Sequence, residues 1–398
     1  MQYILFDDAV RLPLLPFTHT RPVADIRWGI LTMRERWEKL LQASTGTFTV
    51  PHLQQVFPCP AGEDLVWING AIVATAELAT ALQALQPGEQ LVQDQVLIAV
   101  RHKAPALSPD QAAQPLDDIA QQHFAGAVIR LQQVWDIFSG NDQAIRADFE
   151  LLTQGRTSQP LPEHVTAMGE AHIFLEEGAI INPCIINATK GPVYIGRDAE
   201  IMEGCMVRGP FAMGGHSVLK MGAKVYGATT LGEGCKAGGE ISNVVFFANS
   251  NKGHDGFLGN AVIGEWCNLG ADTNCSNLKN NYDTVKIWSE QQERLVSTGL
   301  QFCGLMMGDH SKCGINTMFN TGTVVGVSCN IYGGDFPEKF VPSFSWGGSG
   351  QMTTYAFDKA MDTAERMMIR RGKSLGAAER DMYQYLFTHT SPQRDLKS

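Results

Sequence analysis

Charged side chains are scarce in this sequence, at 18% of 398 residues against about a quarter in an average protein. The 41 acidic residues outnumber the 31 basic ones, which leaves a formal net charge of −10 at pH 7. Binding to a phosphate backbone requires a basic surface, so nucleic acid is not expected as a partner. Glycine is in excess, with 40 residues, but it shows no period of three, which excludes a collagen-like chain.

The sequence also lacks the spacings that mark zinc sites and redox-active thiols. Its nine cysteines include no CxxC pair and no cysteine–histidine arrangement with zinc spacing, so no metal site is expected. Thiols used only as small apolar side chains are typical of a reducing compartment, which favours a cytoplasmic protein. No run of 18 apolar residues is present, and Asp7 and Asp8 interrupt the first apolar segment. Neither a membrane span nor a signal peptide is therefore expected.

Residues 1–150 show the pattern of an α/β domain. Short apolar runs at 3–6 and 65–68 predict buried strands. Apolar residues at helical spacing predict helices over 30–41 and 75–85. Because strand, turn and helix alternate, a parallel sheet with helices on its faces is expected.

Three further local signals complete this outline. Thr75 is expected to be the N-cap of the second helix. A helix over 135–156 leads out of the domain, and a proline-containing linker follows at 158–162. The C-terminal segment 353–387 has a methionine-rich apolar stripe at helical spacing, which predicts a helix packed on a neighbouring coil or subunit.

From about residue 165 an apolar, mostly aliphatic residue returns at every sixth position. The clearest members of this series are Ile195, Ile201, Val207, Leu219, Val225, Leu231, Ile263, Leu269, Met307, Cys313, Phe319, Val325 and Ile331. Glycine often follows the apolar residue, and a small residue stands four positions after it, as in Ile195-Gly196 with Ala199. Three runs of this kind, offset by insertions, indicate a repeat architecture.

A period of six has a specific structural meaning. Six residues accommodate one short strand and one tight turn, and three such units close a triangular coil. The apolar residue is expected to point inward and to stack on its counterpart 18 residues away. The glycine is expected to serve the turn, where φ can be positive. The pattern predicts a parallel β-helix, because a glycine-rich β-sandwich would show period two with hairpin turns every 8–12 residues.

The chain departs from period six between Glu240 and Asp255, where it carries Asn249, Lys252 and His254. An insertion rich in polar groups on a rigid scaffold is typical of a functional loop. A solvated loop with an ordinary surface histidine would have the same composition, so the pattern alone leaves both readings open.

The residues that follow carry a family resemblance. Residues 252–273 read KGHDGFLGNAVIGEWCNLGADT. This resembles the run AGHLxYLGDAxIGxxVNIGAGTITxN in the acetyltransferase domain of the bifunctional N-acetylglucosamine-1-phosphate uridyltransferase/glucosamine-1-phosphate acetyltransferase family. Residues 15–32 and 278–288 are similar to LPFTxTRPVAxIRxGILT and LKNNYxxVKxW in a shorter, diverged branch of sugar nucleotidyltransferases within that family. The resemblance covers almost the entire chain.

The resemblance implies an acetyltransferase site. His254 matches the family's general base, since a neutral imidazole can take the proton of an ammonium nucleophile as it attacks a thioester. Glu240 matches the acidic residue that orients this histidine. The positions that match substrate or cofactor contacts are the sugar-site amides Asn268 and Asn277, Ala271 in the turn that meets acetyl-CoA, and Lys220 near a phosphate-binding arginine.

Several positions depart from the family pattern. The sugar-site tyrosine is Phe257 here, and a phosphate-binding lysine is Ser242. The residue after the Asn-x-x-Ala turn is Asp272 instead of glycine, and a further tyrosine is Leu278. Acetyl transfer is still expected, whereas the identity of the amino-sugar phosphate stays open.

The first domain departs further. Nucleotidyltransferases of the family open with a glycine-rich loop close to GxGTRM, whose backbone amides cradle the triphosphate. Here residues 7–11 read DDAVR without glycine, and Arg21-Pro22 resembles the end of the motif, which makes Arg21 a candidate substrate-binding residue. The expected metal-binding aspartate is Asn69, a weak ligand for Mg²⁺. Two hypotheses stay open: a diverged Mg²⁺-dependent sugar-1-phosphate nucleotidyltransferase, or a domain kept for structure or nucleotide sensing.

The predicted architecture has a Rossmann-like, nucleotidyltransferase-like α/β domain over 1–157, a left-handed parallel β-helix over 163–347 and a helical tail over 348–398. The left hand is implied by the resemblance alone. The predicted function is acetyl transfer from acetyl-CoA to an amino-sugar phosphate such as glucosamine 1-phosphate, with a UDP-N-acetylglucosamine diphosphorylase-like activity as a second one. The alternatives are a nucleotidyltransferase alone or a catalytically diverged sugar-nucleotide-binding scaffold. The resemblance also implies a homotrimer that takes a small sugar phosphate and a nucleotide, without a membrane partner.

Overall fold

The computed structural model describes residues 1–395, and the chain forms two compact units. Unit 1 comprises Met1–Ile26, Leu31–Val134 and Ala377–Tyr383, and unit 2 comprises Arg27–Ile30, Trp135–Gly376 and the remainder of the described chain. No helix within residues 1–395 combines the length and the apolarity needed to cross a membrane.

Unit 1 is built on a six-stranded sheet with the order β2-β1-β3-β5-β4-β6. Its strands are β1 (Gln2–Phe6), β2 (Thr45–Phe48), β3 (Leu65–Asn69), β4 (Glu89–Gln93), β5 (Val96–Arg101) and β6 (Ala120–His123). β1 runs parallel to β2 and β3, whereas β5 is antiparallel to both β3 and β4. The expectation of a wholly parallel sheet is therefore wrong. The chain reverses in a two-residue hairpin at Asp94 and Gln95, both with positive φ, and carries no Asn-Gly or Asp-Gly signal there.

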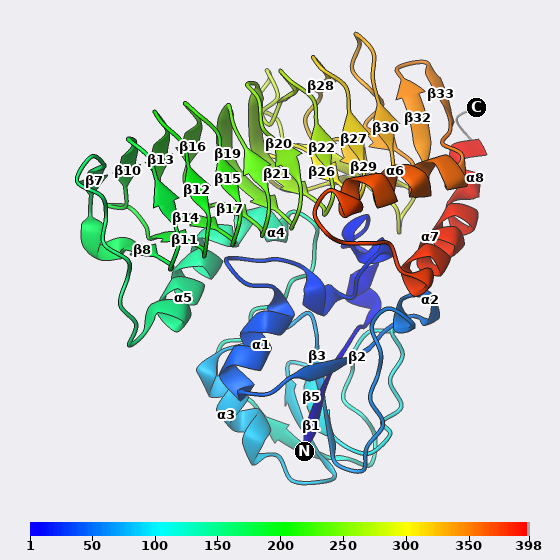
Figure 1. Ribbon diagram of the computed structural model, residues 1–398. Coiled ribbons are helices and arrows are strands. Elements are labelled where there is room, and N and C mark those ends of the chain that lie inside the picture. Colours follow the sequence, from blue (N-terminus) through cyan, green and yellow to red (C-terminus); the bar gives the residue numbers. More distant parts are fainter. Residues whose placement is uncertain (396–398) are drawn as a thin grey trace. The chain divides into compact units, whose positions relative to one another are not determined.

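The helices of unit 1 are α1 (Met33–Leu41), α2 (Pro51–Gln54) and α3 (Ala76–Ala84), with short 3-10 helices η1 (Ala9–Arg11), η2 (Phe17–His19) and η3 (Val23–Asp25). α1 and α3 pack on one face of the sheet, where Trp37 and Leu78 meet alternate strand residues such as Leu5 (Figure 1). Thr75 is confirmed as the N-cap of α3, because its side chain accepts a hydrogen bond from the backbone of Leu78 at 3.2 Å. α1 begins later than residue 30, since Thr32 caps it in a capping box with Glu35.

Unit 2 is a parallel β-helix with three faces, named A, B and C below (Figure 1). Face A contains β7 (Thr166–Met168), β10 (Ile185–Asn187), β13 (Met206–Arg208), β16 (Lys224–Tyr226), the first halves of β19 (Glu240–Phe246) and β21 (Phe257–Ile263), β23 (Asn274–Cys275) and β28 (Met318–Phe319). Face B contains β8 (Ile173–Leu175), β11 (Val193–Ile195), β14 (Phe211–Met213), β17 (Thr229–Leu231), the second halves of β19 and β21, β26 (Met306–Met307), β29 (Val324–Val325) and β31 (Phe340–Val341). Face C contains β9 (Ile180–Ile181), β12 (Glu200–Ile201), β15 (Val218–Leu219), β18 (Lys236–Ala237), β20 (Asn251–Lys252), β22 (Asn268–Leu269), β27 (Lys312–Cys313), β30 (Asn330–Ile331), β32 (Ser345–Gly348) and the antiparallel β33 (Gln351–Thr354).

The period of six is confirmed by the interior of this β-helix. All thirteen residues of the predicted series belong to one buried core cluster. Ile195 pairs through Met213 to Leu231 in steps of 18 residues, so each coil stacks its apolar residue on the next. The small residue four positions on also lies inside, as Ala199 and Cys235 show. The inward stack therefore follows directly from the sequence.

The role expected for the glycines was wrong. Gly196 and Gly232 do not have positive φ; a Cβ atom there would lie only 2.7 to 2.8 Å from the backbone of the next coil. The positive φ falls two residues later, at Asp198 and Gly234. The same offset of two recurs at His216, Trp266, Asp272, His310, Asn316 and Ser328. Glycine is thus required by close coil-to-coil contact, while the left-handed corner accepts several side chains.

The segment 240–255 is not an insertion, contrary to the expectation. Met206 pairs with Lys224, but Lys224 pairs with Glu240, so the coil shortens from 18 to 16 residues. β19 then continues from face A to face B through Asn243, which has positive φ. The period of six is lost here because residues are missing from a coil that otherwise continues.

An insertion does lie between the second and third runs, where an offset was expected from the sequence. Asn274 pairs with Met318, 44 residues later instead of 18. The extra residues leave the coil after β23 and carry an antiparallel hairpin of β24 (Lys286–Ser289) and β25 (Arg294–Ser297). The segment 278–288, which carried part of the resemblance, belongs to this insertion.

Helices begin and end unit 2. The helix expected over 135–156 is two helices, α4 (Asp136–Ser139) and α5 (Asn141–Thr153). They are separated at Gly140, where a Cβ would collide with the Trp28 ring. The expected helix over 353–387 is likewise interrupted: β33 occupies its start, and α6 (Phe357–Ile369) and α7 (Ala377–His389) are separate, followed by α8 (Ser391–Asp395). Apolar periodicity continued across both breaks, so it did not reveal them. Residues 396–398 of the predicted tail lie outside the described residues.

Candidate functional site

A pocket of about 590 Å³ opens at the corner of the β-helix that leads from face C to face A. It is lined by Lys220, Met221, Gly238, Gly239, Gly253, His254, Asp255, Ala271 and Asp272. These residues directly follow four successive strands of face C, so they stack at one corner. Three predicted site residues, Lys220, His254 and Ala271, are brought together there.

Two glycines allow the coils to approach closely at this corner. A Cβ on Gly238 would lie 2.9 Å from the carbonyl oxygen of Gly253. Gly239 has a φ of +74°, and a Cβ on it would lie 2.9 Å from the carbonyl oxygen of His254. Larger residues would push the histidine-bearing turn away, so the shortened coil and its glycines position His254.

The imidazole of His254 is available for chemistry. The side chain is exposed, and its ring forms no hydrogen bond within the described part of the chain. Only the backbone carbonyl of His254 is engaged, as an acceptor from Lys252 Nζ at 2.8 Å. A ring with both nitrogens free can accept a proton from a bound ligand.

Glu240 lies beside the pocket and does not line it. It is the first residue of β19 and half-buried, and its backbone N–H donates to the carbonyl of Gly256 at 3.2 Å. No hydrogen bond joins its carboxylate to His254 within residues 1–395. The positioning role of Glu240 therefore stays a prediction.

Phe257 and Asn277 form a second group, on face A. Phe257 pairs with Glu240 across the β-ladder, and a Cβ on Gly259 would meet both the Phe257 ring and the Asn277 amide. Asn277 Nδ2 donates to Asn260 Oδ1 at 2.8 Å. Two of the predicted sugar-site residues thus lie together over the same glycine, next to the strand that carries Glu240.

Two predicted site residues are not part of either group. Asn268 lies in β22 on face C, in the ladder between Asn251 and Lys312. Arg21 belongs to unit 1, just before η3. Sequence reasoning missed Lys252, which is fully buried and donates to the carbonyls of the turn that carries His254. The register could have revealed it, because Lys252 pairs with Ala237, a core residue of the preceding coil.

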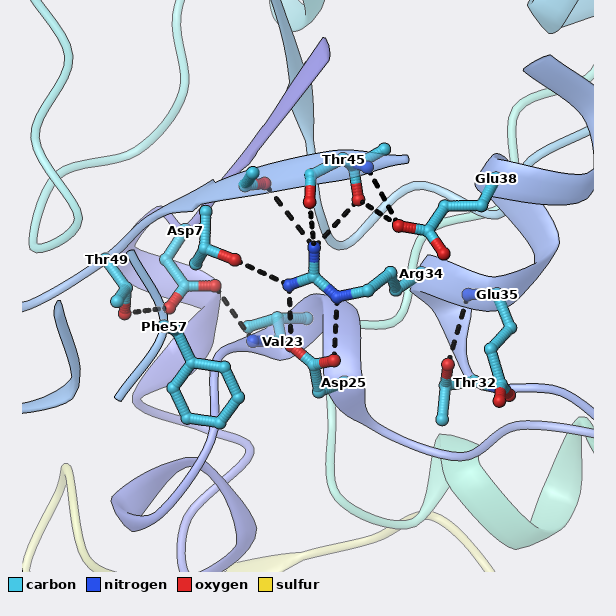
Figure 2. Close-up of polar contacts among 12 residues, drawn as sticks. Asp7, Val23, Asp25, Thr32, Arg34, Glu35, Glu38, Thr45, Thr49 and Phe57 are labelled. Carbon is cyan, nitrogen blue, oxygen red and sulfur yellow. Dashed lines mark hydrogen bonds and ion pairs between the residues drawn. The ribbon is translucent and has the colours of Figure 1, made fainter. Parts of the chain in front are cut away.

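In unit 1, the chain after β1 holds two buried carboxylates. Asp7 accepts hydrogen bonds from the backbone N–H of Val23 at 2.8 Å and from the hydroxyl of Thr49 at 2.6 Å (Figure 2). Burial raises the pKa of Asp7 to about 6, against the lowering effect of these two hydrogen bonds. Beside it, Arg34 forms a two-pronged ion pair with Asp25 at 2.7 and 2.8 Å.

The carboxylate of Asp8 is surrounded by the kinds of donor that form an anion-binding site. Its carboxylate accepts from the backbone N–H groups of Val10 and Ala113, from the amide of Asn69, and from Arg130. Backbone amides and a cation are the groups that hold a phosphate in a nucleotide site. Here they are already bound to the protein's own carboxylate.

The residues at this edge do not fit a magnesium ion. The side-chain oxygen of Asn69 accepts from the backbone of Ala71 at 3.0 Å, and the Asp8 carboxylate is saturated by donors. Across the described residues, no group of three or more His, Cys, Asp or Glu side chains is placed to bind a metal.

The buried state of Asp7 has a measurable consequence. A pKa of about 6 in place of the ordinary 3.8 corresponds to about 3 kcal/mol of stability that is present below pH 4 and lost as the pH rises through 6. Asp7→Asn keeps an acceptor for Val23, so it is expected to raise the free energy of unfolding by up to about 3 kcal/mol at pH 7 and hardly at pH 4. Urea unfolding at the two pH values measures this difference.

Asp25→Asn is the matched control, since it removes one charge of the ion pair with Arg34 and is expected to destabilise the chain at pH 7. A loss of stability in Asp7→Asn at pH 7 as large as at pH 4 would contradict the argument.

Comparison with known proteins finds one family model and several curated relatives. Residues 3–157 match the model of the family described as sugar nucleotidyl transferase. The uncharacterized acetyltransferase YaiX of Escherichia coli O6:K15:H31 is 25% identical over 166 residues, which cover 41% of this chain and 71% of that protein. The bifunctional sugar-1-phosphate nucleotidylyltransferase/acetyltransferase of Sulfurisphaera tokodaii is 32% identical over 147 residues, 36% of each chain. The match thus spans about a third of the length of the bifunctional protein.

Among solved structures, the Arabidopsis UDP-N-acetylglucosamine acyltransferase matches 60% of this chain and 95% of its own, with 14% identity and a TM-score of 0.24. That likeness is too low to carry an argument, and the fold assignment rests on the strand pairing described above.

Proposed function

We propose that the chain is a diverged relative of the bifunctional sugar-1-phosphate nucleotidylyltransferase/acetyltransferases, and that its β-helix unit transfers an acetyl group from acetyl-CoA to the amine of an amino-sugar phosphate. One observation carries the proposal most strongly. Lys220, His254 and Ala271, which the family resemblance nominates, line one pocket.

The charges of the pocket suit such an acceptor. Lys220 supplies an ammonium group that attracts a phosphate, and the carboxylates of Asp255 and Asp272 attract the ammonium form of an amine. A ligand that carries both a phosphate and an amine matches this mixture of signs better than a nucleotide alone.

In the proposed reaction His254 is the general base. The acceptor nitrogen attacks the carbonyl carbon of the thioester, a C–N bond forms, and the C–S bond breaks. The His254 imidazole first takes one proton from the bound ammonium, which frees the nitrogen lone pair for the attack, and later releases it to water. The second proton, which the nitrogen loses after the C–N bond forms, goes to the departing thiolate. Glu240 is proposed to orient the histidine, and Phe257, Asn268 and Asn277 to contact the sugar.

A second candidate activity is favoured by the family match of residues 3–157. Unit 1 would then join a sugar 1-phosphate to a nucleoside triphosphate, with Arg21 as a phosphate contact. The filled anion position at Asp8 argues against it. A sugar-nucleotide-binding scaffold without turnover is the remaining alternative.

One paired assay separates the three. The full chain is incubated with acetyl-CoA and glucosamine 1-phosphate, and thiol release is measured; in parallel it is incubated with UTP or dTTP, a sugar 1-phosphate and Mg²⁺, and pyrophosphate release is measured. Thiol release that depends on the amino sugar is the expected result. Pyrophosphate release alone would favour the nucleotidyltransferase, and ligand binding without either product would favour the scaffold.

The pocket is open in a single chain, with His254 exposed. We propose that it is completed in a homotrimer, as the family resemblance implies.

A further inference from the structure

A lysine lies in the interior stack of the β-helix. Lys252 ends β20 and pairs with Ala237 of the preceding coil, and the neighbouring strand β22 presents Leu269 at the same register. Ala237 and Leu269 belong to the apolar core, and the side chain of Lys252 is 0% exposed. A buried ammonium is costly unless hydrogen bonds compensate it, so its partners matter.

All three partners of the ammonium are carbonyl oxygens of the pocket corner. Lys252 Nζ donates to the carbonyls of His254 at 2.8 Å, Asp255 at 3.2 Å and Gly238 at 3.2 Å. Three donors meet three acceptors, which satisfies the group completely. The acceptors come from two successive coils, the shortened one that ends in Gly238-Gly239 and the one that carries His254.

We propose that Lys252 is a positioning residue for the acetyl-transfer site, tying the turn that carries His254 to the glycine turn of the shortened coil from inside the β-helix. The proposal rests on the proposed function, because the turn that it holds carries the proposed general base. Lys252 touches no substrate: its ammonium faces the backbone, and its effect reaches the ligand only through the position of His254.

Burial and the neighbouring charges act in opposite directions on the protonated form of Lys252. Burial lowers its pKa to about 8, while the charges of Asp255 and Asp272 and the thiol of Cys313 oppose this effect. His254 and Lys220 are the other titratable groups of the same pocket. Loss of the proton would leave only two donors for three carbonyls.

A lysine is not needed to fill this space. Methionine matches the aliphatic part of the side chain and packs well in irregular cores. Replacement of a buried charge by an apolar group of similar size often leaves stability unchanged or raises it. Lys252→Met is therefore expected to fold, with an unfolding temperature equal to or above that of the parent protein.

The test measures backbone exchange and activity in the full chain. In Lys252→Met, hydrogen–deuterium exchange of the peptides that contain residues 238–240 and 253–256 is expected to rise at least tenfold, with the remaining coils unchanged. Acetyl transfer is expected to lose about 10- to 100-fold in kcat, because misplacement of a catalytic group by about 1 Å has effects of this size. Lys252→Gln, which retains two donors, is expected to be intermediate and serves if the methionine variant does not fold.

Lys236→Met is the matched control, since Lys236 is an exposed lysine in the adjacent strand β18. Unchanged exchange in the two turns of Lys252→Met overturns the proposal. A lower unfolding temperature with full kcat also overturns it, since that is the result of a purely structural role. If the parent protein transfers no acetyl group, the proposed function fails, while the exchange experiment still decides whether Lys252 holds the two turns.

Discussion

Replacement of His254 by alanine is expected to lower kcat for acetyl transfer by about 10²- to 10⁴-fold, because a general base contributes acceleration of that size. The effect should fall on kcat more than on KM, since the ring acts on the proton that moves in the transition state. The imidazole is exposed at the pocket and forms no hydrogen bond within residues 1–395, so its removal leaves no polar group unpaired. Steady-state thiol release, with circular dichroism as a check on folding, measures the result.

Two control variants distinguish the loss of a general base from the loss of any histidine. His172→Ala removes an exposed histidine elsewhere in unit 2, in the short helix η4 (Glu170–His172), and should keep full activity. His254→Gln retains hydrogen-bonding groups and lacks a basic nitrogen, so it should be as slow as the alanine variant. An active His254→Gln would show that the residue orients the acceptor and does not remove its proton.

Replacement of Arg130 by methionine is expected to destabilise unit 1 by about 3 to 5 kcal/mol, the usual cost of leaving a buried charge without its partner. Asp8 is 1% exposed, and Arg130 is its ion-pair partner. The remaining donors, Val10, Ala113 and Asn69, are neutral and compensate only part of the negative charge. Urea unfolding of the full chain at pH 7 gives the change in free energy.

A double variant that removes both members of the ion pair provides the internal check. Asp8→Asn combined with Arg130→Met removes both charges, so the double variant should recover most of the lost stability. Lys103→Met is the control for a surface pair in the same unit, because Lys103 and Glu63 are both exposed and should contribute less than about 1 kcal/mol. A double variant no more stable than Arg130→Met alone would show that packing of the arginine, and not its charge, is the source of the loss.

The ion pair of Asp8 and Arg130 lies where the sequence of unit 1 departs from the nucleotidyltransferase motif. Sequence reasoning identified the missing glycine loop and Asn69 in place of an aspartate. It did not identify what replaces them, because the four donors around Asp8 come from residues 10, 69, 113 and 130. Only the folded sheet brings these positions to one carboxylate.

In the β-helix, too, some features follow from the local sequence and others only from the fold. The period of six placed the inward residues correctly, since Ile195, Leu231 and Ile331 all lie in the core. Local spacing suffices there, because each coil repeats the same strand and corner. The shortened coil before Glu240 was misjudged as an insertion, since a change in coil length appears in the sequence only as a lost period. The insertion after Cys275 lies between the second and third runs, where an offset was expected.

By itself the sequence determined the six-residue repeat, because the repeat depends on residue type and local spacing. The family resemblance of its motifs nominated His254, Lys220 and Ala271. Tertiary structure alone decided that these three side chains share a corner pocket and that Lys252 lies inside the stack beneath them. The physical reason is that the corner is built from four successive coils. Its geometry depends on their relative register, which is set by strand pairing between distant residues.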